Sequence, residues 1–269
     1  MSYVNDTYDI IILAGQSNAQ GCGRGETTEE YIPDPDIMHL FENCTYEVRV
    51  KDGIEKMCVV CDDPNLYIDI AKERCDEAGK ISSFGLSFAR EYKKAGLLPK
   101  GRKLLIVEAG VGGTGFKKKQ WGVGDELYER MLRMIDYALS LNSESTLKAL
   151  LWHQGEHDAF EGNPPEIFES QLCALVRAVR ARYNLKDLPF ISADFVNEWK
   201  NKNIDICAPI VAKIKSVTEG EGGVFIETAD LLSNNQNHGD GDDIHFCRES
   251  LNILGRRYFE AYKNLLNKK

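Results

Sequence analysis

Four apolar runs of six or seven residues recur along the chain, each long enough to form a buried strand. They cover residues 8–14 (YDIIILA), 104–109 (LLIVEA), 147–152 (LKALLW) and 190–195 (FISADF). Runs without polar alternation are typical of strands that are buried on both faces of a parallel sheet. The pattern therefore predicts four central strands.

Helical spacing of apolar residues follows most of these runs. It predicts helices over residues 86–94, 127–141 and 165–183, and a last helix from about residue 249. Strands that alternate with helices predict an α/β class fold, a three-layer α/β/α sandwich around a mainly parallel sheet. No repeat, linker or change of composition divides the 269 residues, so we expect a single domain over residues 1–269.

The segment from about residue 22 to residue 83 is less regular, and we interpret it as an insertion over the carboxyl edge of the sheet. Residues 46–60 (YEVRVKDGIEKMCVV) predict a hairpin, because Asp52-Gly53 is a favoured two-residue turn. Two alternatives stay open for this hairpin. It shapes a ligand pocket, or it is a surface hairpin without a ligand role.

The charge of the chain narrows the choice of partners. The formal net charge is −9, which argues against a nucleic-acid partner and against an anionic membrane surface. The composition, 43% hydrophobic and 28% charged, is ordinary for a globular protein. A small or neutral substrate fits these values better.

The first residues and the cysteines suggest a cytoplasmic location. MSYVNDTYDI lacks the basic start and apolar segment of a secretory signal, and no stretch is long enough to span a bilayer. Free thiols are therefore expected for the eight scattered cysteines. Cys58 and Cys61 form a single C-x-x-C pair, which is weak support for a metal or redox site.

Ser17 follows the first predicted strand, within the small and polar stretch GQSNAQG. Ligands of parallel sheets bind outside the carboxyl ends of strands, so a nucleophilic serine would be well placed here. The G-x-S-x-G elbow is not present, because Ala19 stands at its last glycine. By position alone, a turn or helix-capping serine is the main alternative.

A second cluster, HGDGDDIHF, covers residues 238–246. Asp242 precedes His245 by three residues, a spacing that lets the carboxylate reach one ring nitrogen and leaves the other free for a serine. Asp243 is a less favourable candidate for the same role. The alternatives are an acidic calcium-like loop, although the EF-hand pattern is incomplete, or a solvated turn.

The stretch GVGGTG, residues 110–115, follows the strand LLIVEA and formally satisfies the dinucleotide-binding pattern G-x-G-x-x-G. That pattern should open directly into a helix, but helical spacing resumes only near Asp125. A nicotinamide-dependent oxidoreductase is thus the rival hypothesis from this motif. Glycines at the end of a strand can instead direct a backbone N–H at an oxyanion.

The stretch WHQGEHD, residues 152–158, follows a third strand. Gln154 could donate its side-chain amide to a developing negative charge. His153, Glu156, His157 and Asp158 are of metal-ligating types, but they do not form H-E-x-x-H and share no helical face. Metal binding is therefore the weaker interpretation.

Together, four blocks resemble the SGNH-hydrolase superfamily: GQSNA.G at residues 15–21, GGT at 112–114, HQGE.D at 153–158 and D..H at 242–245. Within it, they are most similar to the sialate O-acetylesterase and acetylxylan esterase branch, carbohydrate esterase family six. The resemblance implies a flavodoxin-like α/β/α sandwich. Segment 22–83 matches no block of this family.

Carried over to this chain, the resemblance implies Ser17 as nucleophile, His245 as general base and Asp242 as the acid that orients the imidazole. The implied oxyanion hole consists of the backbone N–H groups of Ser17 and Gly112 and the side chain of Gln154. The resemblance also implies supporting roles for the remaining block residues Gln16, Gly113 and Glu156.

The activity implied by this resemblance is a serine esterase that removes O-acetyl groups from carbohydrates, either acetylated xylo-oligosaccharides or sialic acids. It implies no metal or organic cofactor, and a small acetylated carbohydrate as partner. The alternatives are a carbohydrate-binding protein on an inactive esterase fold and a general short-chain acyl esterase. The oligomeric state stays open.

Overall fold

The structure is a computed structural model that describes residues 5–42, 45–51, 53–60, 65–77 and 79–267. Its centre is β1, whose apolar residues are buried on both faces of a sheet. Among the described residues this sheet has seven strands in the order β11-β10-β9-β1-β8-β2-β5. Their bounds are Val224–Ile226 (β11), Phe190–Ala193 (β10), Thr146–His153 (β9), Thr7–Gly15 (β1), Arg102–Glu108 (β8), Ile37–Glu42 (β2) and Leu66–Ile70 (β5). All neighbours are parallel except β2 and β5, which confirms the predicted mainly parallel sheet.

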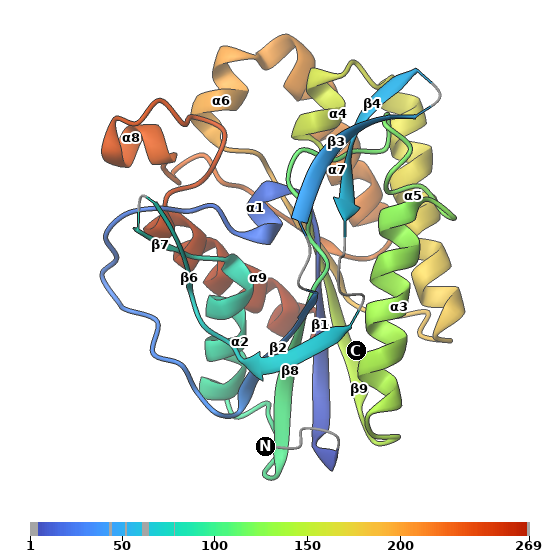
Figure 1. The fold of residues 1–269 in the computed structure, drawn as a ribbon, viewed down its shortest axis with the longest axis vertical. Helices are drawn as coiled ribbons and strands as arrows, with labels where there is room; N and C mark the ends of the chain where they lie inside the picture. The colour runs from blue at the N-terminus through green and yellow to red at the C-terminus, as the bar shows by residue number, and fades with distance from the viewer. Residues whose placement is uncertain (1–4, 43–44, 52, 61–64, 78, 268–269) are drawn as a thin grey trace.

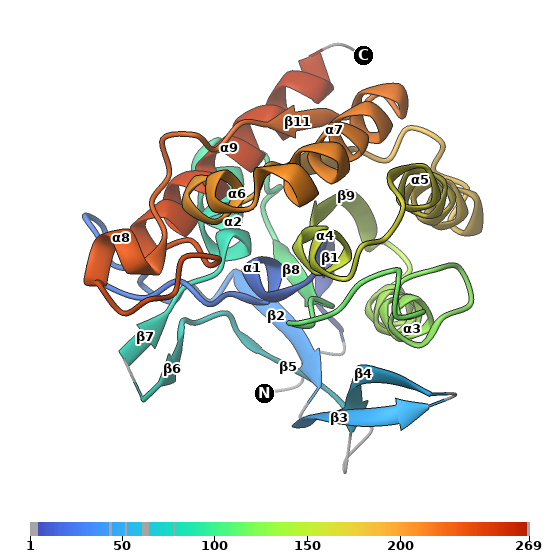
Figure 2. The same ribbon diagram turned by 90° about the horizontal axis from the view of Figure 1, so that it is seen from above.

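Helices cover both faces of the sheet (Figures 1 and 2). On one face, α2 (Phe84–Lys94) and α9 (Arg248–Asn267) pack on alternate β1 residues such as Ile11. On the other, α3 (Glu126–Ser140), α5 (Pro165–Arg182) and α7 (Ile204–Gly220) enclose the other β1 residues, such as Ile12. The predicted three-layer α/β/α sandwich is therefore confirmed.

The predicted helices and strands lie close to the observed ones. The sequence analysis did not predict the shorter elements. Beyond those already given, the structure contains the short helices α1 (Ser17–Gln20), α4 (Glu156–Phe160), α6 (Asn197–Lys202) and α8 (Asn234–His238). The pattern also missed α7, which carries Pro209 within its first two turns. In the described part of the chain, the helices are all too short or too polar to cross a bilayer.

Segment 22–83 is not wholly an insertion over the sheet, which corrects the prediction. Its strands β2 and β5 extend the central sheet at one edge. The predicted hairpin is present as β3 (Thr45–Lys51) and β4 (Ile54–Val60), with Gly53 at φ 74° in the turn, whereas Asp52 lies outside the described residues. A second small hairpin joins β6 (Arg74–Asp76) and β7 (Gly79–Ile81). Figure 2 shows β3 and β4 beyond the β5 edge of the sheet.

The ends of β1, β8 and β9 meet at the carboxyl edge of the sheet, where their loops are tied together. Gln16 N donates to the carbonyl of His153 at 2.9 Å, and Val111 N donates to that of Gly15 at 3.0 Å. Gly15 has φ 126°, and a Cβ atom on it would lie 2.0 Å from the His153 carbonyl oxygen. Only glycine lets the chain turn so close to the neighbouring strand. Three of the four sequence blocks are thereby brought to one place.

Candidate active site

Ser17 is the first residue of α1 and lines a cavity of about 530 Å³ at the carboxyl edge of the sheet. The cavity also contains His245, more than two hundred residues further along the chain. Ser17 is 7% exposed. No side-chain hydrogen bond caps α1, and Gln16 holds the N-cap position. The alternative of a capping serine therefore has no support from the structure.

His245 and Asp242 form a close pair on the loop before α9. His245 Nδ1 lies 2.8 Å from Asp242 Oδ1 and 2.9 Å from Oδ2. Its other ring nitrogen, Nε2, is thereby left for the cavity that Ser17 also lines. The alternative acid, Asp243, instead pairs with Lys202 Nζ at 2.9 Å on the surface. The geometry therefore selects Asp242 as the partner of the imidazole.

The second carboxylate oxygen of Asp242 is fixed by Asn234, a buried residue that the sequence analysis did not single out. Asn234 Nδ2 donates to Asp242 Oδ2 at 2.9 Å, and Arg24 Nη1 lies 3.6 Å from the same oxygen. Burial acts to raise the pKa of Asp242, but hydrogen bonds from His245 and Asn234 outweigh it and hold the pKa below its usual value. The carboxylate thus stays ionised beside the imidazole.

Asn18 is a further residue that the motif contained but the site prediction omitted. Its Nδ2 donates to the carbonyl of Ile244 at 3.2 Å, and its Oδ1 accepts from the backbone N–H of Phe246 at 3.1 Å. These two peptide groups lie on either side of His245. Asn18 Nδ2 also donates to Glu156 Oε1 at 3.1 Å. Asn18 therefore joins the loop of Ser17, the loop of His245 and α4.

The glycines of the GGT block reach the same cavity. Gly112 and Gly113 both line it, and the backbone N–H of Gly112 donates to Gln20 Oε1 at 2.8 Å. The chain continues through turns until α3 begins at Glu126. The dinucleotide-binding pattern requires a helix directly after its glycines, so the structure does not support that alternative.

The side chain of Gln154, a predicted oxyanion donor, is hydrogen-bonded to other groups of the protein. Its Nε2 donates to Asp158 Oδ2 at 2.5 Å and to the carbonyl of Thr114 at 3.3 Å. Both partners are acceptors, so the amide N–H groups must point at them, away from a reacting ester. Gln154 is also absent from the residues that line the cavity. The two amide hydrogens of Gln154 are therefore already bound within the protein, and the oxyanion role of Gln154 stays a prediction.

The side-chain amide of Gln16, the residue before Ser17, is oriented by backbone groups at the start of α4. Its Oε1 accepts from the backbone N–H groups of Gly155 at 3.4 Å and His157 at 3.2 Å. These two hydrogen bonds show that the amide oxygen of Gln16, and not its nitrogen, faces α4. Gln16 lines the cavity beside Ser17. Its Nε2 donates no hydrogen bond to the described residues.

Glu156 is fully buried, lines the same cavity and lies beside His153. His153 Nε2 is 3.4 Å from Glu156 Oε1. Burial acts to raise the pKa of Glu156, but the His153 imidazole and the Asn18 amide outweigh it, so the pKa is lowered. Glu156 Oε1 accepts from Asn18, the residue after Ser17, and its supporting role stays a prediction.

Asp158 connects the HQGE.D block to the loop after GGT. Its carboxylate accepts from the backbone N–H groups of Phe116 at 2.9 Å and Lys117 at 2.8 Å, and from Asn163 Nδ2 at 2.8 Å. Burial raises its pKa, against the effect of these hydrogen bonds. Asp158 thus positions a loop and does not face the cavity.

Metal binding at the HQGE.D block finds no support from the side chains. Among the described residues, no three His, Cys, Asp or Glu side chains converge in a way that could hold an ion. Five cysteines of the described part are free thiols, as expected. Cys61 lies outside the described residues, so the structure says nothing of the C-x-x-C pair.

The wall of the cavity combines apolar and polar side chains. Ile244, Trp199 and Phe160 line it, and Phe160 is 72% exposed although it is a large aromatic residue. His157 also lines it, and burial lowers the pKa of its imidazole. Both alternatives for the β3–β4 hairpin stay open, because the side chains of β4 are not described.

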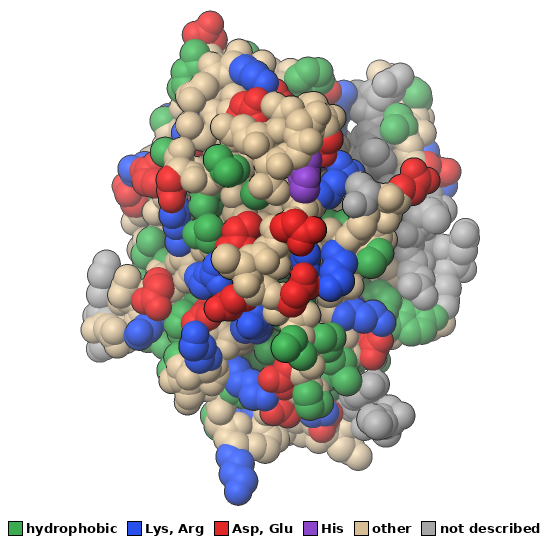
Figure 3. Space-filling model, turned by 90° about the vertical axis from the view of Figure 1, so that its left-hand side faces the viewer, with side chains coloured by type: hydrophobic (Ala, Val, Ile, Leu, Met, Phe, Trp, Pro, Cys, Tyr) green, Lys and Arg blue, Asp and Glu red, His purple; other side chains and the backbone are tan. Residues whose placement is uncertain are grey.

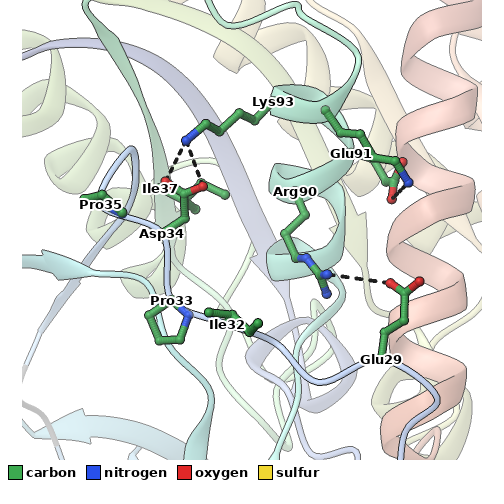
Figure 4. A pocket seen from close by; sticks show the side chains of 10 residues that line it. Glu29, Ile32, Pro33, Asp34, Pro35, Ile37, Arg90, Glu91 and Lys93 are labelled. Atoms are coloured by element: carbon green, nitrogen blue, oxygen red, sulfur yellow. Dashed lines mark hydrogen bonds and ion pairs between the residues drawn. The ribbon is translucent and has the colours of Figure 1, made fainter.

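A second cavity, of about 670 Å³, lies between α2 and residues 29–37 (Figure 4). Its charged side chains are paired with one another. Lys93 Nζ lies 2.7 Å from Asp34 Oδ1, and Arg90 Nη2 lies 3.6 Å from Glu29 Oε2. None of the predicted site residues lines it. Figure 3 likewise shows acidic and basic side chains interspersed over one face of the molecule.

The fold and the Ser17 cavity define a class of protein. A serine, an imidazole and a carboxylate placed at the carboxyl edge of an α/β/α sheet are the groups that serine hydrolases use. The family model of "Carbohydrate esterase, sialic acid-specific acetylesterase" matches residues 7–264. The chain therefore belongs to this family of carbohydrate esterases, which confirms the resemblance.

Relatives agree with this assignment. The chain is 27% identical over 199 residues to "Probable carbohydrate esterase At4g34215" of Arabidopsis thaliana, a match that covers 68% of this chain and 66% of the relative. The crystal structure of NanS is 19% identical, covers 98% of this chain and 99% of its own, and has a TM-score of 0.72. That of XAC1771 from Xanthomonas citri, whose title calls it a carbohydrate acetylesterase, is 16% identical with a TM-score of 0.61; the match covers 97% of this chain and 57% of that one. These two structures support the fold.

Proposed function

We propose that this chain is a serine esterase that removes acetyl groups from carbohydrate hydroxyls through an acetyl-serine intermediate. The observation that carries the proposal is the pairing of His245 Nδ1 with Asp242, which leaves Nε2 for Ser17 in the shared cavity. Membership of the carbohydrate esterase family supports the substrate class.

In the first half of the reaction, Ser17 Oγ attacks the acetyl carbonyl carbon while His245 Nε2 accepts the hydroxyl proton. Asp242 stabilises the imidazolium that forms. The tetrahedral intermediate collapses when the bond to the sugar oxygen breaks, and His245 returns the proton to that oxygen. Water then attacks the acetyl-serine with the same base, and acetate is released.

The negative charge of the tetrahedral intermediate needs donors close to Ser17. We assign the backbone N–H of Ser17, which is the first of α1, and that of Gly112. The Nε2 of Gln16 takes the third position in place of Gln154. Removal of one oxyanion donor costs on the order of 10²- to 10³-fold in rate.

Acetate release from acetylated xylo-oligosaccharides and acetylated sialic acids by the wild type and by Ser17→Ala tests the proposal. We expect activity in the wild type and a loss of at least about 10³-fold in the variant. Asp242→Asn should lose activity, and Asp243→Asn, whose carboxylate faces Lys202, serves as the matched control. Full activity of Ser17→Ala would rule out the mechanism.

A further inference from the structure

The Gly112 N–H, one of the proposed oxyanion donors, is occupied in the structure. It donates to Gln20 Oε1 at 2.8 Å, and both residues line the cavity beside Ser17. A carboxamide oxygen is the same kind of acceptor as the carbonyl oxygen of an ester. Gln20 Oε1 therefore takes the hydrogen bond that the substrate carbonyl needs when Ser17 attacks.

The Gly112 N–H has one hydrogen, and Gln20 Oε1 already accepts it. Gln20 and Ser17 both lie beside Gly112, since a Cβ atom on Gly112 would lie 3.1 Å from Gln20 Oε1 and 3.4 Å from Ser17 Cβ. The Gln20 side chain must leave before an ester oxygen can approach the Gly112 N–H.

Hydrogen bonds fix the backbone of Gln20 and the backbone next to Gly112. The Gln20 side chain is not fixed in this way. Gln20 N donates to the carbonyl of Gln16 at 2.9 Å, and the Gln20 carbonyl accepts from Arg74. Next to Gly112, Val111 N donates to the Gly15 carbonyl at 3.0 Å. Within the described residues, the Gln20 carboxamide has the Gly112 N–H as its one partner. Rotation of this side chain is therefore the movement that opens the donor.

We propose that Gln20 is a specificity-determining residue. Its carboxamide oxygen accepts from the Gly112 N–H when no substrate is bound, and substrate displaces it. This inference rests on the proposed esterase function. The displaced carboxamide needs new partners, because an unpaired polar group costs free energy. The hydroxyls of a sugar supply them at the cavity mouth, but the alcohol part of an aryl acetate does not. Gln20 thus favours acetyl esters of polyhydroxylated alcohols.

Gln20→Met tests this role, because methionine has a similar length and lacks the carboxamide. We expect kcat/KM for 1-naphthyl acetate to rise about two- to tenfold, the equivalent of one hydrogen bond. The value for an acetylated monosaccharide should stay constant or fall, so the sugar preference decreases. An unchanged or larger preference would overturn the role of Gln20.

Gln20→Glu should lower activity, in contrast to the rise that is expected for the aryl ester in Gln20→Met. A carboxylate binds an N–H more strongly than a carboxamide does and repels an oxyanion, so kcat/KM should fall for both esters at neutral pH and recover in acid. Equal activity of this variant and the wild type across pH would contradict the contact with Gly112.

Hydrogen exchange of the Gly112 amide gives a readout that does not depend on turnover. The Gly112 N–H should exchange faster in Gln20→Met than in the wild type, because its acceptor is gone. Equal exchange rates would overturn the proposal directly. A wild type that cleaves neither ester would refute the proposed function, whereas an active wild type with unchanged preference in Gln20→Met would refute the role of Gln20 alone.

Discussion

Asn18 holds His245 in place from both sides, through the peptide groups that precede and follow it. Its side chain donates to the Ile244 carbonyl and accepts from the Phe246 N–H. Asn18 directly follows Ser17 in the chain. The proposed nucleophile and base are thus connected through one buried side chain, although more than two hundred residues separate them.

Asn18→Ala should therefore reduce turnover more than binding. The variant loses both anchors of the His245 loop, and a displacement of about 1 Å can cost roughly 10²-fold in rate. We expect kcat to fall about ten- to hundredfold with KM nearly unchanged. Steady-state kinetics on an acetylated sugar measure this separation.

Asn252→Ala is the matched control, because Asn252 is equally buried. Its Oδ1 accepts from Ser82 and Ser87 at 3.0 Å each, away from the cavity. It should lose stability like Asn18→Ala but keep its kcat. Similar kcat values in the two variants would show that Asn18 does not position His245.

The Asp242 carboxylate predicts a pH dependence of stability. Its pKa is lower in the folded protein than in the unfolded chain, where it is about 3.9. Its hydrogen bonds therefore stabilise the fold above about pH 4, and this contribution is lost as the pH falls through the folded-state pKa. Thermal melting of the wild type and of Asp242→Asn between pH 7 and pH 3 should show a difference that shrinks below about pH 4. A difference that stays constant over this range would contradict the prediction.

The central fold was accessible from the sequence because its strands are buried on both faces. The apolar run of β1 has no polar side chain after Asp9, so its period and length identify it. Strand β2, which pairs with β8, was not predicted because His39 and Glu42 interrupt its apolar pattern. Both are buried only because partners from elsewhere in the chain meet them: His39 Nδ1 lies 3.2 Å from Glu108, and Arg130 Nε donates to Glu42 at 2.5 Å.

The sequence predicts site contacts between residues that are close together in the chain. It does not predict contacts between residues that are far apart in the chain. The spacing of Asp242 and His245 sets their contact within one loop. The direction of the Gln154 amide depends on Asp158 and Thr114, and the sequence does not show which acceptor an amide faces. Gln20 was missed because its contact with Gly112 joins residues 92 positions apart.

Asp158→Ala should destabilise the fold strongly. The Asp158 carboxylate accepts from the N–H groups of Phe116 and Lys117 and from the amide of Asn163. The variant leaves these buried donors without their shared acceptor. We expect the free energy of unfolding to fall by about 3 kcal/mol, because unpaired buried donors cost about 1–3 kcal/mol each and the loop relaxes in part. Urea denaturation measures the change. Glu161→Ala, which removes a partly exposed ion pair with Lys118, is the control and should change stability by less than about 1 kcal/mol.

Phe160 should contribute to sugar binding and not to the chemical step. It lines the cavity mouth and is 72% exposed, so its ring is free to cover the apolar face of a sugar. Burial of about 50 Å² of apolar surface in that contact contributes roughly 1 kcal/mol. Phe160→Ala should therefore raise KM for an acetylated oligosaccharide about fivefold, with kcat kept and with 1-naphthyl acetate unaffected. The control is Ile167→Ala, an exposed apolar residue outside the cavity. Equal KM changes for both esters would show that Phe160 shapes the cavity without contacting the sugar.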